Sequence, residues 1–253
     1  MASLDGRHAV VTGGGRGIGR AIGAALTHAG ARVTVVGRQE TALADAVAQG
    51  EARGYFVADV TDQRAVGEGL QRAAAECGTI DILVANAGGA ESAPFAGSDP
   101  DMFRRMFELN TMSLVYAAHE VIGGMVTHGF GRIVAIASTA GLKGYGYVSA
   151  YCAAKHAAVG LVRALAVETA KTGVTVNAVC PGYADTSLVQ DSIARIQNKT
   201  GQSHEQVLGA MLKDMPLGRL IRPAEVAAAV VFLCSPEAAA ITGTTLTVAG
   251  GEL

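Results

Sequence analysis

Short apolar runs rich in β-branched residues alternate along the chain with longer segments in which alanine and leucine recur at helical spacing. Such runs are typical of buried strands, and the longer segments are typical of helices that cover a sheet. The predicted strands are His8–Thr12, Arg32–Val36, Gly54–Ala58, Ile80–Ala85, Arg132–Ala137, Thr175–Val179 and Thr245–Val248. The predicted helices lie near 17–29, 40–49, 62–77, 100–127, 149–172 and 223–234. This alternation predicts an α/β fold with right-handed crossovers: a doubly wound, seven-stranded parallel sheet flanked by helices on both faces.

The chain of 253 residues is 50% hydrophobic and only 17% charged, which suits one large domain around a buried parallel sheet. No linker divides it, so we predict that residues 1–253 form a single domain. One irregular region runs from Gly182 to about Leu217. It would lie at the carboxyl edge of the sheet, where ligands bind in such folds. We therefore expect residues 183–217 to form a substrate lid; the alternative is a helical insertion on the surface.

Charge and cysteine usage narrow the class of partner. The net charge of −2 provides no basic surface for nucleic acid and no polybasic patch for a membrane. The start of the chain lacks a signal-peptide core, and the apolar run Val226–Cys234 is too short to cross a bilayer. The cysteines show neither metal-binding nor redox spacing; they are Cys77, Cys152, Cys180 and Cys234. We expect a cytoplasmic protein with reduced thiols and no metal site.

A glycine loop, Thr12–Gly19, follows the first predicted strand and opens the first predicted helix. Glycines allow the backbone to approach a pyrophosphate closely, and the helix N-terminus offers free N–H groups to the phosphates. The spacing T-G-x-x-x-G-x-G differs from the commoner G-x-G-x-x-G, and a tight turn alone also favours glycine. Its place between strand and helix predicts dinucleotide binding. The residues expected to take part are Gly13, Arg16, Gly17, Ile18 and Gly19.

The end of the second predicted strand bears on the choice of dinucleotide. Folds that bind NAD place an acidic residue there to accept hydrogen bonds from the ribose hydroxyls. This chain instead has Gly37 followed by Arg38, and Arg16 stands in the glycine loop. Two guanidinium groups at the adenosine ribose would suit a 2′-phosphate, so we favour NADP(H) over NAD(H). The alternative is that both arginines are simply solvated.

Tyr151 and Lys155 stand four residues apart in a predicted helix and so share one face. An ordinary amphipathic helix can contain such a pair. Other motifs in the chain change this interpretation. Asp59-Val60 follows the third predicted strand, Asn86-Ala87-Gly88 ends the fourth, and Asn110 lies in the long fourth helix. Further motifs are Ser138, thirteen residues before Tyr151, then Pro181-Gly182 after the sixth strand, and Thr186.

In order and spacing, these motifs resemble the short-chain dehydrogenase/reductase family from Thr12 to Gly251, nearly the whole chain. The resemblance implies a Rossmann fold and a set of catalytic residues, Asn110, Ser138, Tyr151 and Lys155. By the same resemblance, further cofactor contacts are Asp59, Val60, Asn86, Ala87, Gly88, Tyr151, Lys155, Pro181, Gly182, Ala184 and Thr186.

The resemblance also implies a role for each catalytic residue. Tyr151 would be the general acid in reduction and the base in oxidation, while Ser138 would hold the carbonyl oxygen. Lys155 would bind the nicotinamide ribose. Asn110 would kink the long fourth helix and anchor a water that relays protons to Lys155. Because an ammonium favours the tyrosinate, we expect Lys155 to lower the pKa of Tyr151 toward working pH.

Two groups within the family resemble the chain. The segments around Ser138 and Pro181 look like those of 3-oxoacyl and polyketide ketoreductases. Reductases that meet an acyl carrier protein often have basic residues where this chain has Gly129 and Thr172, which weakens the case for that partner. The segment from Thr186 looks like 3-hydroxybutyrate dehydrogenases, an NAD-dependent alternative.

Those dehydrogenases hold a small carboxylate with side chains that are absent here. The corresponding positions are Gly89-Ala90, Ala140 and Val148. A free short hydroxy acid is therefore disfavoured. The pocket near Tyr145, Tyr147, Tyr183 and Met211 would be mostly apolar, which suits an acyl thioester or a cyclic or aryl ketone. A catalytically silent dinucleotide-binding scaffold is a further alternative, but the chain retains all four catalytic residues.

Members of the family commonly form tetramers through the helices near 100–127 and 149–172 and through the last strand. We expect a homotetramer here. The small and apolar positions that would allow close helix contact are Ala150, Ala154, Ala158, Leu161 and Leu165. Burial against the protein's own sheet would produce the same pattern. The family often has an aspartate before the final Gly-Gly, and its replacement here by Ala249 has no physical account.

Overall fold

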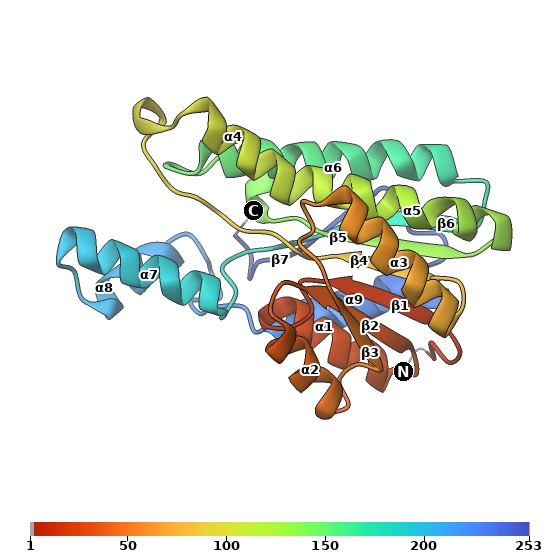
Figure 1. The fold of residues 1–253 in the computed structure, drawn as a ribbon. Helices are drawn as coiled ribbons and strands as arrows, with labels where there is room; N and C mark the ends of the chain where they lie inside the picture. The colour runs from red at the N-terminus through yellow and green to blue at the C-terminus, as the bar shows by residue number, and fades with distance from the viewer. Residues whose placement is uncertain (1–2, 253) are drawn as a thin grey trace.

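The computed structural model describes residues 3–252, and these contain one seven-stranded, all-parallel sheet in the order β3-β2-β1-β4-β5-β6-β7 (Figure 1). The strands are β1 (His8–Thr12), β2 (Arg32–Gly37), β3 (Gly54–Val57), β4 (Ile82–Ala85), β5 (Gly131–Ile136), β6 (Val174–Pro181) and β7 (Thr245–Val248). The predicted doubly wound fold is confirmed. The strand order reverses between β1 and β4, and folds of this kind bind ligands at the carboxyl ends of the strands at such a reversal.

Five of the predicted strands, β2 to β6, differ from the structure by one or two residues at one or both ends, and two of these differences matter here. β4 begins at Ile82 rather than Ile80, and β6 extends through Pro181, which was predicted to follow it. Proline lacks the N–H that a central strand needs. Pro181 is tolerated because β5 pairs with β6 only as far as Val179, so the ladder on that side does not require the missing N–H.

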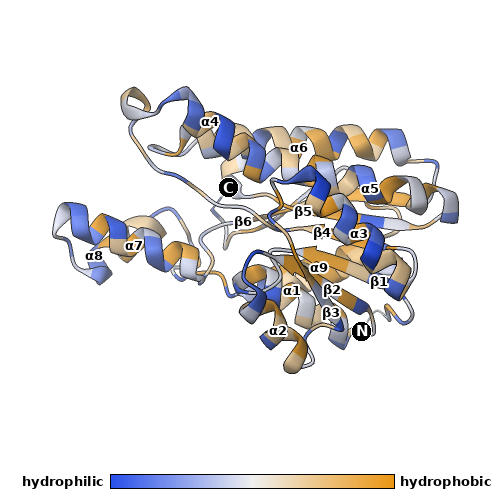
Figure 2. Ribbon diagram, viewed as in Figure 1, coloured by the Kyte–Doolittle hydropathy of each residue, from blue (hydrophilic) through white to orange (hydrophobic). Residues whose placement is uncertain are grey.

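Alternate side chains of the strands enter two separate hydrophobic cores. Val10 and Leu83 belong to one core, whereas Val11 and Val84 belong to the other. Because successive side chains of a strand point to opposite faces, both faces of the sheet are buried. This explains why strands such as β5 have largely apolar sequences; apolar residues are orange in Figure 2.

Helices cover each face of the sheet. The helices are α1 (Gly17–His28), α2 (Glu40–Ala48), α3 (Gln63–Cys77), α4 (Pro100–Phe107), α5 (Ser113–His128), α6 (Ser149–Thr169), α7 (Ser187–Thr200), α8 (His204–Leu212) and α9 (Pro223–Cys234). α3, α5 and α6 pack on one face, and α1, α2 and α9 pack on the other (Figure 1). α6 ends at Thr169, three residues before the predicted limit.

The helix predicted at 100–127 is interrupted. A π-helical turn, Glu108–Met112, separates α4 from α5. Asn110 lies in this turn, and its Nδ2 donates hydrogen bonds to the carbonyl oxygens of Gly89 and Met106, each at 3.0 Å. The bond to Gly89 connects the helix to the segment after β4. The helix is therefore interrupted at the residue whose side chain bonds to another part of the chain.

The region after β6 is more regular than predicted, because it contains α7 and α8. Figure 1 shows these two helices projecting from the sheet. Ser203 begins α8 with a capping box, in which its side chain and that of Gln206 each bind the other's backbone N–H. A parallel bridge between Ala184 and Ile221 joins the two ends of the region.

Within residues 3–252, one helix, α6, is long and apolar enough to cross a membrane by length and composition alone. It packs against β6 and α4, and its buried residues include Ala150, Ala154 and Ala158. The core of a globular fold accounts for this apolar character. Of the two explanations for these alanines, burial within the chain itself therefore applies, and they are not available for contacts between subunits.

Candidate active site

The glycine loop has the close packing expected at a helix N-terminus that receives a ligand. Gly13 has φ of 66°, and a Cβ there would lie 2.8 Å from Nδ2 of Asn86. A Cβ on Gly19 would lie 2.2 Å from the carbonyl oxygen of Gly13. Larger residues therefore cannot occupy either position without movement of their neighbours. Ile18, between them, packs partly into the core below.

Asn86 and Thr12 join the ends of β4 and β1. The backbone N–H groups of Asn86 and Ala87 both donate to Oγ1 of Thr12, at 3.0 Å each. The Asn86 side chain donates to the Thr12 carbonyl at 2.9 Å. Asn86 is expected to brace the cofactor. In the structure it braces the turn that begins the glycine loop.

Arg38 and Asp59 lie together at the ends of neighbouring strands. Nη1 of Arg38 is 3.6 Å from Oδ2 of Asp59, and the Arg38 side chain is 72% exposed. The backbone N–H of Thr61 is the main group that lowers the pKa of Asp59, with a smaller contribution from Arg38. A loose, exposed pair of this kind contributes little to stability, so Arg38 can bind another anion at little cost. Arg16 is also exposed, at the start of α1.

Other predicted cofactor residues follow the carboxyl ends of the strands. A Cβ on Gly17 would lie 3.3 Å from Cγ2 of Thr186, so the start of α7 approaches the glycine loop closely. Val60 and Ala184 are buried, and Val60 packs into the core on the side of α3. Gly182 lies just beyond β6, where its N–H donates to the carbonyl oxygen of Val248 at 3.1 Å.

The four predicted catalytic residues come from three segments. Ser138 follows β5, and its hydroxyl accepts a hydrogen bond from the N–H of Ala140 at 3.1 Å. Tyr151 and Lys155 lie on successive turns of α6, and Nζ of Lys155 is 5.7 Å from the Tyr151 ring centre. A Cβ on Gly88 would lie 2.8 Å from Oδ1 of Asn110 and 3.3 Å from Nζ of Lys155. The fold thus brings these side chains to one place.

The electrostatics of the pair differ from the expectation. Burial raises the pKa of Tyr151 to about 12, and the Ser138 hydroxyl offsets part of this. Burial lowers the pKa of Lys155 to about 8. Nζ of Lys155 donates to the carbonyl oxygen of Ile136 at 2.9 Å. The pKa of Tyr151 is thus shifted opposite to the expected lowering by Lys155, because burial of the phenol dominates and Lys155 is not among the groups that lower it.

A cluster of polar side chains near the C-terminal end was not predicted from the sequence. Glu252 is buried, and Oε1 accepts a hydrogen bond from the Tyr145 hydroxyl. Nζ of Lys143 donates to the Glu252 carbonyl oxygen at 2.9 Å. The pocket expected to be mostly apolar near Tyr145 therefore contains a carboxylate. A glutamate after a pair of glycines carries no signal of burial, so sequence reasoning had no means of finding it.

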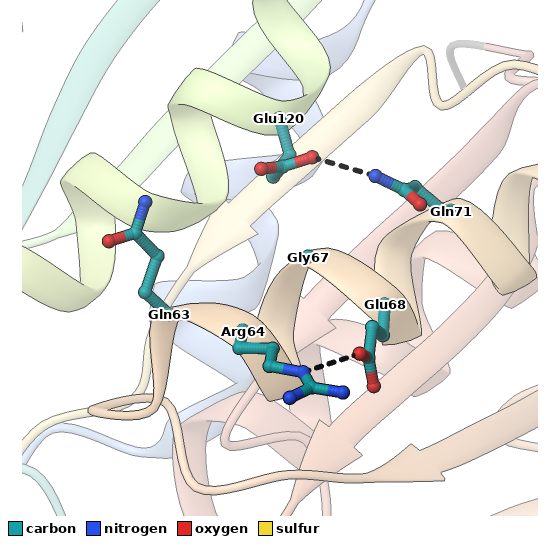
Figure 3. A pocket seen from close by; sticks show the side chains of 6 residues that line it. All are labelled: Gln63, Arg64, Gly67, Glu68, Gln71 and Glu120. Carbon is teal, nitrogen blue, oxygen red and sulfur yellow. Dashed lines mark hydrogen bonds and ion pairs between the residues drawn. The ribbon is translucent and has the colours of Figure 1, made fainter.

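Two surface hollows lie apart from these residues. One, of about 380 Å³, lies between α3 and α5 (Figure 3), and its lining residues are Gln63, Arg64, Gly67, Glu68, Gln71 and Glu120. The other, of about 400 Å³, is lined by Phe95, Ser98, Pro100, Phe103 and Arg104. Neither contains a predicted site residue. The chemistry of the side chains, rather than the size of a hollow, identifies the candidate site.

Comparisons with known proteins agree with this arrangement. A family model described as Enoyl-(Acyl carrier protein) reductase matches residues 13–252. The acetoacetyl-CoA reductase of Shinella zoogloeoides is 39% identical, over 97% of this chain and 98% of its own. The D-beta-hydroxybutyrate dehydrogenase of Cupriavidus necator is 36% identical, with 98% of both chains covered.

A solved structure extends the agreement to the fold. A variant of actinorhodin polyketide ketoreductase, crystallised with NADPH, superposes with a TM-score of 0.93 at 34% identity, covering 100% of this chain and 99% of that one. The similarity spans the glycine loop, the sheet and the helix of Tyr151 and Lys155. The chain belongs to the short-chain dehydrogenase/reductase family of oxidoreductases.

Proposed function

We propose that the protein is an NADP(H)-dependent oxidoreductase that interconverts a ketone and a secondary alcohol. The observation that carries this proposal is the position of Ser138, Tyr151 and Lys155 at the carboxyl edge of the sheet, beside a glycine loop that opens α1. Hydroxyl groups and a buried ammonium in one place suit proton transfer to a carbonyl oxygen.

The residues present fit a dinucleotide. Gly13 and Gly19 allow the backbone to turn tightly into α1, because Asn86 and the Gly13 carbonyl leave no room for a side chain at either position. The helix N-terminus formed in this way offers its N–H groups to a pyrophosphate. When bound, the nicotinamide supplies or accepts the hydride. Arg38 stands at the strand end where the adenosine ribose is expected, and its loose pairing with Asp59 leaves it able to bind a 2′-phosphate. The related ketoreductase crystallised with NADPH supports this choice over NAD(H).

In this mechanism the chain's own residues hold the carbonyl oxygen and move the proton. Ser138 donates a hydrogen bond to the oxygen, and Tyr151 gives its phenolic proton during reduction. Lys155, with a pKa of about 8, is mostly charged near neutral pH and stabilises the phenolate that remains. Asn110 lies close enough to Gly88 and Lys155 to hold a water on the path to solvent.

The substrate proposed is a 3-oxoacyl-type or bulky apolar ketone, including an acyl thioester. Relatives named for acetoacetyl-CoA and ketoacyl reduction support it. An NAD-dependent 3-hydroxybutyrate-type activity is the second candidate, supported by the relative with that name. The residues that would clamp a free carboxylate are absent, with Ala140 and Val148 in their places. A silent scaffold is the third, disfavoured by the complete catalytic set.

The remaining proposals concern the whole protein, which we propose to be one domain in the cytoplasm. Residues 183–217, including α7 and α8, would form the substrate lid, because Thr186 lies close to the glycine loop. The exposed face of α6, which includes Gly160 and Val167, would serve a homotetramer; Val167 is 79% exposed.

The test is a panel of ketones, ketoesters and acetoacetyl-CoA, assayed with NADPH and with NADH by the loss of reduced-cofactor absorbance. Reduction of at least one neutral ketone or thioester, faster with NADPH, is the expected result. Preference for NADH with free acetoacetate would favour the second candidate. Cofactor binding without turnover of any substrate would favour the scaffold.

A further inference from the structure

The loop between β5 and α6, residues 142–148, connects Ser138 to Tyr151. It contains Gly144 and Gly146, and Tyr147 has φ of 66°, a conformation that residues with side chains rarely adopt. Glycines give a loop many conformations in the absence of other contacts. The distance between the two groups that would hold the ketone oxygen therefore depends on what fixes this loop.

Glu252 fixes the loop from the other end of the chain. Its side chain is only 3% exposed, and Oε1 accepts the hydrogen bond of the Tyr145 hydroxyl. Nζ of Lys143 lies 3.4 Å from the same oxygen and donates to the Glu252 carbonyl at 2.9 Å. Lys143 and Tyr145 alternate with the two glycines. The residues bound to Glu252 therefore adjoin the flexible glycines.

The same contacts continue to the catalytic serine. The Tyr145 hydroxyl is also hydrogen-bonded to Oγ1 of Thr139 at 2.7 Å. Thr139 is buried and follows Ser138 directly in the chain. A displacement of Tyr145 would therefore move Thr139 and, through it, Ser138.

Glu252 also contacts the end of β6. Its Oε2 is buried with no hydrogen-bond partner among the described residues, and it lies 2.8 Å from the position of a Cβ on Gly182. Only glycine leaves room for the carboxylate there. Leu217, at the end of the proposed lid, donates its N–H to the carbonyl oxygen of Gly250 at 3.0 Å. The C-terminal segment thus joins the catalytic loop, the end of β6 and the base of the lid.

We propose, on the basis of the proposed function, that Glu252 is a positioning residue for the reaction. Through Tyr145 and Lys143 it holds loop 142–148 so that Ser138 and Tyr151 keep the separation that a ketone oxygen requires. Glu252 itself makes no contact with the substrate in this role.

The test compares Glu252→Ala, Glu252→Gln and Tyr145→Phe with the parent protein. Glu252→Ala is expected to lower kcat by about 10-fold or more, because small misplacement of reacting groups is costly, while KM for NADPH changes less than about 2-fold. Glu252→Gln retains an acceptor for Tyr145 and should recover most of kcat. Tyr145→Phe removes the hydrogen bond but keeps the ring, and should resemble Glu252→Ala.

Asp81→Asn is the matched control, because Asp81 pairs with Arg7 at 3.0 Å at the opposite edge of the sheet. It should lose stability without loss of kcat. Hydrogen exchange of the amides of 142–148 provides a readout that needs no substrate, and exchange should quicken in Glu252→Ala.

Unchanged exchange in the loop, or kcat within about 2-fold of the parent in Glu252→Ala, overturns the inference. If Glu252→Ala does not fold, Tyr145→Phe decides in the same way. Failure of the proposed function is recognised separately: the parent protein would then turn over no ketone of the panel, or Tyr151→Phe would retain full turnover, whatever the loop amides show.

Discussion

Titratable side chains are buried at both ends of the parallel strands: at the amino edge, where the strands begin, and at the carboxyl edge, where they end. The surroundings of these side chains differ. At the amino edge, Nδ1 of His8 is 2.8 Å from the Gly78 carbonyl oxygen, and Nε2 is 3.0 Å from Oγ1 of Thr34. Both ring nitrogens are thus paired. At the carboxyl edge, Lys155 is equally enclosed, yet within the described part of the chain its ammonium makes a single hydrogen bond, to Ile136.

The number of hydrogen bonds that each side chain makes distinguishes a buried side chain with a structural role from one that is available for chemistry. A buried polar group with every bond satisfied stabilises the fold. A buried ammonium with spare donors remains able to bind a ligand, at a cost in desolvation that lowers its pKa. The amino edge has exceptions of its own, since Nε of the buried Arg132 and Oγ1 of Thr175 find no partner within residues 3–252. The Arg132 guanidinium instead stacks over Phe130, 4.4 Å from the ring centre.

The largest expected effect is at the carboxyl edge. Tyr151→Phe should lower kcat by about 10²–10⁴-fold, because it removes the proposed acid, while NADPH binding is retained. Steady-state kinetics and cofactor fluorescence measure the two quantities. Tyr55→Phe, on the exposed β3 position bonded to Glu40, is the control and should have normal turnover. Normal turnover in Tyr151→Phe as well would refute the acid assignment.

The next largest expected effect is on the preference for NADPH over NADH. Arg38→Ala should lower kcat/KM with NADPH by about 10–100-fold, the loss expected for charge-assisted hydrogen bonds to a phosphate, and should leave NADH nearly unaffected. Arg64→Ala, which removes an exposed arginine paired with Glu68 on α3, provides the control. Equal effects of Arg38→Ala on both cofactors would remove the argument for a 2′-phosphate.

Two threonines allow a direct comparison of the edges. Thr12→Val removes the acceptor of two backbone N–H groups at the glycine loop, and should lower the free energy of unfolding by about 1–3 kcal/mol and weaken NADPH binding. Thr34→Val removes one bond to His8 and should reduce stability alone. Urea unfolding and cofactor titration distinguish them. Loss of cofactor binding in Thr34→Val would show that the edges are not separate.

The smallest effect concerns pH. Burial lowers the pKa of His8 from 6.5, so the unfolded chain takes up a proton at a higher pH than the folded one. The stabilisation from neutral His8 is fully present above pH 6.5 and is lost as pH falls below it, by about 1 kcal/mol per pH unit. Urea unfolding at about pH 7.5 and 5.5, on either side of the ordinary histidine pKa, measures this. His8→Gln should remove most of the dependence, and an equal slope in that variant would exclude His8 as its source.

The sequence by itself determined the sheet, its flanking helices and the family, because apolar periodicity and the order of short motifs are local properties. The predicted limits of β1 and β7 match the structure to the residue. The interruption at Asn110 could be expected from the family resemblance but not from apolar periodicity, since the Asn110 side chain bonds to Gly89, 21 positions away.

Only the tertiary structure decided which groups are desolvated and which meet. The pKa of Tyr151 is shifted opposite to expectation because burial, not sequence spacing, controls it. Tyr145 and Glu252 are 107 positions apart, and nothing local in either segment indicates that they share a hydrogen bond. Burial and long-range contact arise when the sheet and its helices pack, and these determine how the candidate site is held.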